Sequence, residues 1–105
     1  MKQWVIDFGL NIEEVRERLG EEIPDLPYAQ LCDWFTEQLV KEFPKYALME
    51  PTEDARDGET FGVRMVVDSP FRPKMISKYF DLVEVHNYEE IYGSRQDEND
   101  TDTRS

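Results

Sequence analysis

Residues 60–68, T-F-G-V-R-M-V-V-D, form the clearest strand pattern in the chain. The alternation places its large apolar side chains on one face: Phe61, Val63, Met65 and Val67. A period of two is typical of a strand with one face buried in a core. Just upstream, Asp57-Gly58 is a strong turn signal,. We therefore predict a polar, turn-rich loop over residues 51–59 and a short strand over 46–50 that pairs across it.

Further upstream, residues 28–43 predict an amphipathic helix ended by Pro44. The apolar residues recur at spacings of three and four: Tyr28, Leu31, Cys32, Phe35, Leu39 and Phe43. Asp25 is a candidate cap, and Pro27 suits the first turn. A shorter helix is predicted over residues 12–19.

That shorter helix has clear start and stop signals. Asn11 is a good N-cap, Glu14 stands three residues later, and Gly20 is a natural C-terminal stop,. Before it, residues 4–8 predict a strand that Gly9 ends.

Downstream of the central strand, two prolines precede a predicted short basic helix over residues 74–79. Residues 80–86 then predict a further strand. Asn87 is placed to cap a last helical turn that contains Glu90 and ends at Gly93.

This order of elements predicts an α+β two-layer sandwich, with a small antiparallel sheet packed by two main helices. Residues 1–94 are expected to form a single domain. Residues 95–105 lack large apolar side chains and are rich in acidic ones, so we expect a disordered acidic C-terminal tail,.

The charge balance bears on function. Asp and Glu number 24 against 12 Lys and Arg, for a formal net charge of −12. Residues 1–94 alone contain twenty acidic and ten basic side chains, a net charge of −10. Such a surface is repelled by nucleic acid and by anionic membranes and attracted to basic surfaces. We expect a protein partner with a basic surface and no direct binding of nucleic acid or membrane.

The candidate partner-binding residues lie on the polar sides of the two helices. They are Glu13, Glu14, Glu17, Glu21, Glu22, Asp33, Glu37 and Trp34. A solvated helix face explains the carboxylates equally well. Trp34 is a candidate anchor, either for a partner or for a homodimer, since aromatic residues are frequent interface hot spots.

Signs of catalysis are sparse. His86 is the only histidine, and Cys32 lies on the apolar stripe of the long helix, where a thiol is inert,. The alternative hypothesis is a small enzyme or anion-binding domain that uses His86 with Arg72 and Lys74. In that hypothesis Arg72 and Lys74 lie at the start of the predicted basic helix, where backbone N–H groups favour anions. Lys78 is the third candidate anion-binding residue.

No metal or cofactor is expected. The acidic loop at residues 53–59 lacks the ligand spacing of a calcium loop,. The single cysteine suits a reducing cytoplasm, and no apolar run approaches the roughly 20 residues of a membrane span. The sequence thus favours a small acidic non-enzymatic binding module, an inhibitor or adaptor that docks on a nucleic-acid-binding surface, as a DNA mimic of the phage type does.

Overall fold

The computed structural model describes residues 2–46 and 50–93 and confirms the α+β class. Four strands form one antiparallel sheet in the order β2-β3-β1-β4. The strands are β1 (Lys2–Asn11), β2 (Glu50–Arg56), β3 (Thr60–Ser69) and β4 (Leu82–Asn87). The helices are α1 (Ile12–Leu19), the 3₁₀ turn η1 (Gly20–Glu22), α2 (Tyr28–Glu42) and α3 (Tyr88–Tyr92). Among the described residues, no helix has the length and apolar character needed to cross a membrane.

The long pair β1 and β3 forms the centre of the sheet. The two strands pair along their whole length, from Lys2 opposite Ser69 to Asn11 opposite Thr60. The predicted strand over 60–68 is therefore confirmed, but the prediction that Gly9 ends the first strand is wrong. Gly9 lies inside β1, paired with Gly62 on one side and Leu82 on the other. Cross-strand pairing overrides its weak strand propensity.

The acidic segment over residues 51–59, predicted to be a loop, is mostly strand. Residues 50–56 form the edge strand β2, and only Asp57 to Glu59 turn the chain into β3. Charged residues and Pro51 are typical of edge strands, which they protect from further pairing. The predicted strand over 46–50 falls mainly on residues 47–49, which lie outside the described residues.

The predicted helix starts are largely confirmed. Asn11 caps α1 by accepting a hydrogen bond from the Glu14 N–H at 3.1 Å. Asn87 and Glu90 form a capping box on α3. Pro27, rather than Asp25, occupies the cap position of α2, with no side-chain cap bond.

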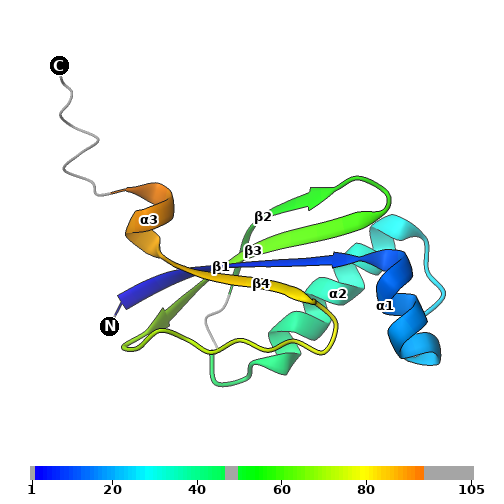
Figure 1. Cartoon of the computed structure of the whole chain (residues 1–105), viewed down its shortest axis with the longest axis horizontal. Coiled ribbons are helices and arrows are strands. Elements are labelled where there is room, and N and C mark those ends of the chain that lie inside the picture. The colour runs from blue at the N-terminus through cyan, green and yellow to red at the C-terminus, as the bar shows by residue number, and fades with distance from the viewer. Residues whose placement is uncertain (1, 47–49, 94–105) are drawn as a thin grey trace, which may run out of the picture.

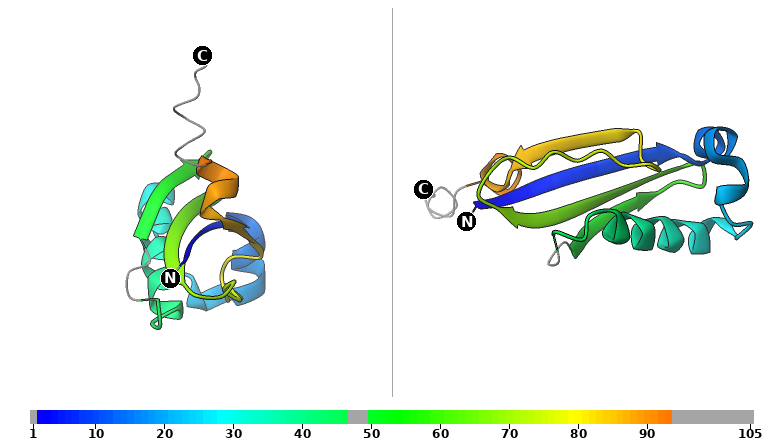
Figure 2. Two further views of the ribbon diagram at one scale, coloured as in Figure 1. Left: turned by 90° about the vertical axis from the view of Figure 1, so that its left-hand side faces the viewer. Right: turned by 90° about the horizontal axis from the view of Figure 1, so that it is seen from below.

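Helix α2 covers one face of the sheet, while α1 lies beyond one end of it and α3 near the other (Figure 1). Residues 70–81 run along the α2 side of the sheet as an extended segment (Figure 2). The predicted basic helix over 74–79 is therefore wrong. Packing against the core holds this segment extended, because Met75 and Phe80 are buried while Ile76 is 88% exposed.

The core lies between the sheet and this covering layer. It is rich in aromatic contacts: Phe80 meets Phe8 and Phe35 edge-on, with ring centroids 5.7 and 6.0 Å apart. The extended segment is fixed to α2 by Glu42, which accepts hydrogen bonds from the Ser77 hydroxyl and the Lys78 N–H. On the opposite face of the sheet, here called the open face, α3 at one end is the one covering element within residues 2–46 and 50–93, and its Tyr92 lies against Arg64.

Candidate functional site on the open face

The open face is hollowed at the end near α1. At one level across the sheet, the outward positions are Ala55, Gly62, Gly9 and Leu82, one from each strand. Gly62 and Ala55 leave little side-chain cover there, while the Leu82 side chain packs beside Gly9, with its Cδ2 3.1 Å from where a Cβ of residue 9 would lie. A mostly apolar hollow of about 480 Å³ includes all four residues. Leu82 is 55% exposed at its edge.

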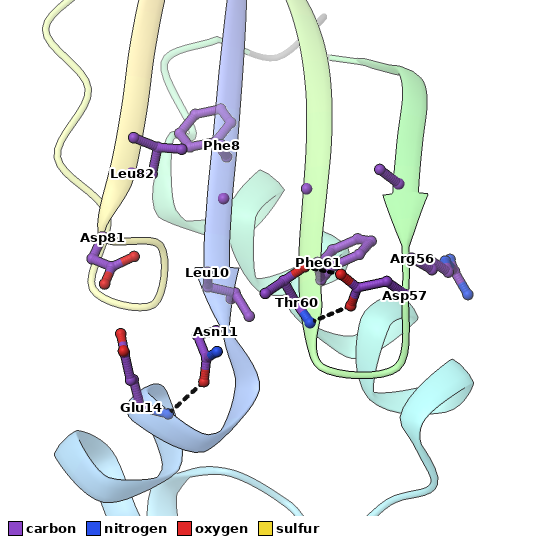
Figure 3. Close-up of a pocket in the computed structure, with 13 residues that line it drawn as sticks. Phe8, Leu10, Asn11, Glu14, Arg56, Asp57, Thr60, Phe61, Asp81 and Leu82 are labelled. Atoms are coloured by element: carbon purple, nitrogen blue, oxygen red, sulfur yellow. Dashed lines mark hydrogen bonds between the residues drawn. The ribbon is translucent and has the colours of Figure 1, made fainter.

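Carboxylates lie around this hollow. Glu14 and Asp81 stand on the α1 and β4 side, and Asp57 stands on the β2–β3 turn (Figure 3). Asp57 accepts hydrogen bonds from the Thr60 N–H and hydroxyl and from the Glu59 N–H. Those bonds, to Thr60 above all, lower the pKa of the Asp57 carboxyl below its ordinary value. Asp57 is therefore ionised at neutral pH, and it is held in one orientation.

The one basic residue that lines the hollow, Arg56, is already paired. Its guanidinium contacts Asp33 at 2.9 Å and Asp54 at 3.1 Å. It also lies over the Phe61 ring, 5.5 Å from the centroid. Because two other carboxylates offset the charge of Arg56, the three rim carboxylates give the hollow a negative character.

Next to the hollow, a charged row crosses the open face. Glu53, Arg64, Asp7 and Glu84 occupy successive strands at the same level. Arg64 donates to both Asp7 oxygens at 2.7 and 3.1 Å, and this bonding raises the pKa of its guanidinium. The Arg64 guanidinium also lies over the Tyr92 ring of α3, with its Cζ 6.0 Å from the ring centroid.

His86 lies beside this row. It is two residues beyond Glu84 on β4, and its Nε2 is 3.3 Å from Asp7 Oδ2. Arg72 lies elsewhere: its guanidinium donates to the Val85 carbonyl at the sheet edge and lies over Trp4, on the core side. The structure therefore does not bring His86 together with Arg72.

The predicted anion-binding residues Arg72, Lys74 and Lys78 also lack the helix on which that prediction depended. Lys74 is exposed on the extended segment, and Lys78 pairs with Glu22. Since residues 74–79 are not helical, no helix N-terminus stands beside Arg72 and Lys74 to hold an anion.

The predicted acidic residues are divided between two places. Glu13, Glu14, Glu17, Glu21 and Glu22 belong to α1 and η1, at the end of the molecule where the hollow lies (Figure 1). Asp33 and Glu37 are on α2, where Asp33 binds Arg56. Only Glu14 of this set lines the hollow.

Trp34 is half-buried in the covering layer. Its ring meets Phe35 and Tyr79 edge-on, with centroids 5.2 and 5.4 Å apart. Cys32, two residues before it on α2, is fully buried, and burial raises the pKa of its thiol. Both positions agree with roles in packing.

Sequence reasoning missed Asp57, Asp81 and the glycine pair of the hollow. The signal was present in the strand pattern, because Gly62 stands where a strand would otherwise show a side chain. Glycine inside a strand often marks a close approach of ligand or backbone. No family model, curated protein or solved structure matches this chain.

Proposed function

We propose that this protein is a non-enzymatic binding module that docks the hollow on a basic surface of a protein partner. The observation that supports the proposal is the placement of Glu14, Asp57 and Asp81 around a mostly apolar hollow. An apolar side chain of the partner would fill the hollow, and flanking Lys or Arg side chains would meet the rim. Apolar anchors surrounded by complementary charge are typical of protein interfaces.

The net charge of −12 supports the same partner chemistry, because it steers basic surfaces toward the chain over a distance,. A surface that normally binds nucleic acid has the required charge. The proposed role is therefore that of an inhibitor or adaptor that occupies such a surface, as a DNA mimic does. The lone buried Cys32 suits action in the cytoplasm,.

The proposal is tested by retention of partners from a lysate of the source cells on three baits. The baits are the wild-type chain, Asp81→Lys at the rim, and Glu37→Lys as a control with the same change of charge. Glu37 is exposed on α2 and does not line the hollow. The proposal is supported by a protein that the wild-type and Glu37→Lys baits retain at low salt, that the Asp81→Lys bait does not retain, and that high salt removes. Displacement by duplex DNA identifies its surface as one that binds nucleic acid.

Two results contradict the proposal. One is retention of the same proteins by Asp81→Lys and the wild type, with no effect of salt. The other is equal loss on Asp81→Lys and Glu37→Lys, which would assign binding to net charge rather than to the hollow.

A further inference from the structure

We propose that Asp7, Glu84 and His86 form a site for one divalent transition-metal ion, best suited to Zn²⁺, on the open face. The three residues come from two paired strands. Asp7 of β1 is directly opposite Glu84 of β4, and His86 follows two residues later on the same face. Their potential ligand atoms all lie within 4.8 Å of one another.

The two separations from His86 fit a small ion, and the Asp7 and Glu84 oxygens lie within 4.8 Å of each other. His86 Nε2 is 3.3 Å from Asp7 Oδ2 and 3.6 Å from Glu84 Oε1. Ligand atoms bound at about 2.0–2.1 Å around a tetrahedral zinc ion lie about 3.3 Å apart. A nitrogen and two carboxylate oxygens form a donor set that zinc accepts, and magnesium prefers oxygen ligands alone.

A second observation points to a cation. His86 Nε2 is the one buried side-chain nitrogen or oxygen without a hydrogen-bond partner among residues 2–46 and 50–93. Buried polar atoms of this kind are rare in folded proteins, and a bound ion is one of the groups that can satisfy them. This nitrogen lies 3.3 Å from Asp7 Oδ2 and 3.6 Å from Glu84 Oε1 but forms a hydrogen bond to neither. A nitrogen that faces two carboxylate oxygens is the arrangement of a metal ligand set.

The charge around the cluster also favours a bound cation. The charged row contains three carboxylates, on Glu53, Asp7 and Glu84, and one guanidinium, on Arg64. With a neutral imidazole these described residues have an excess of two negative charges. One divalent ion offsets this excess. The double hydrogen bond from Arg64 holds the Asp7 carboxylate in place, as outer-shell partners do in metal sites,. Glu84 is 59% exposed and leaves the cluster open to solvent.

The test is calorimetric titration of the untagged, chelator-treated full chain with Zn²⁺ in millimolar Mg²⁺. The magnesium occupies weak carboxylate sites elsewhere on the acidic chain. NMR of the imidazole is the second readout, and its signals need no assignment because His86 is the only histidine. We expect one equivalent of Zn²⁺ to bind and to shift these ring signals.

Variants make the assignment specific. Glu84→Gln and His86→Gln should each weaken zinc binding by at least about tenfold, the lower limit for loss of even an outer-shell partner. Glu89→Gln is the matched control, since Glu89 is exposed on α3 and outside the cluster. Circular dichroism verifies that each variant is folded.

The proposal is overturned if Zn²⁺ does not bind saturably with one-to-one stoichiometry, or if the His86 ring signals do not shift when Zn²⁺ is added. It is also overturned if Glu84→Gln and Glu89→Gln bind zinc as tightly as each other. Because the partner retention experiment uses the rim of the hollow, its outcome is independent of this one.

Discussion

Gly9 of β1 and Gly62 of β3 lie directly opposite each other, so the two central strands present no side chain at this level of the open face. Their backbones do not require glycine, because neither residue is among those with positive φ. A Cβ at position 62 would have the Phe8 carbonyl oxygen, at 3.5 Å, as its one near neighbour. At position 9 a Cβ would lie 3.1 Å from Leu82 Cδ2, so packing against Leu82 explains that glycine. Glycine in a strand destabilises it, so Gly62, which no close contact requires, favours a role in admitting a partner.

Filling the hollow should separate binding from stability. In Gly62→Val the new side chain has ordinary contacts at its Cβ and a better strand propensity,. We expect the free energy of unfolding to be unchanged or to rise by up to about 1 kcal/mol. Affinity for a basic partner should fall by about tenfold or more. Denaturant unfolding and a binding titration measure the two effects, and undiminished affinity would refute the role of the hollow.

Phe80 should be among the residues most important for stability. It is 1% exposed and meets the rings of Phe8, Phe35 and Phe61. Phe80→Ala leaves a cavity beneath the sheet and should destabilise the fold by about 3–5 kcal/mol. Urea unfolding gives the value. A loss below about 1 kcal/mol would show that the segment over residues 70–81 does not pack as described.

Cys32 should be unreactive in the native state. Its thiol is fully buried, and burial raises its pKa, so little nucleophilic thiolate is present at neutral pH,. Labelling with a disulfide reagent should be slow in buffer and complete within minutes in denaturant. Rapid stoichiometric labelling of the folded chain would instead indicate an accessible thiolate.

Asp57 should make the turn sensitive to acid. Because folding lowers the pKa of its carboxyl below 3.8, the stability that it contributes is full above that pH,. This stability is lost as the pH falls through the lower pKa that the Asp57 carboxyl has in the folded state. Asp57→Asn should therefore unfold at lower denaturant concentration than the wild type near neutral pH, and the gap should narrow below pH 3.8. A gap independent of pH would exclude the charge as its cause.

Local signals in the sequence predicted several elements closely. The cap at Asn11, the stop at Gly20 and the three- and four-residue spacing after Tyr28 describe interactions between near neighbours. Each therefore appears in the sequence as a short pattern. The alternation in residues 60–68 likewise reports one buried face, and β3 has that face.

Interactions between distant residues were harder to predict. Strand β2 has a polar composition and is held by pairing with β3, so its own residues resemble a loop. The segment over residues 70–81 is extended because it packs along the sheet, which its Met75 and Tyr79 spacing does not reveal. Asp7, Glu84 and His86 are brought together by strand register alone. No spacing within the chain indicates such a cluster.

The most direct test of the docking proposal uses a defined probe. A short peptide with one Leu or Phe flanked by Lys and Arg is titrated into the isotope-labelled chain, and the amide signals are followed by NMR. The chain has five glycines, so the Gly9 and Gly62 signals are readily assigned. We predict saturable shifts at Gly9, Gly62, Asp57 and Asp81. A peptide with Ser in place of the apolar residue should produce much smaller shifts. Shifts spread evenly over all acidic segments, or equal for both peptides, would contradict the account.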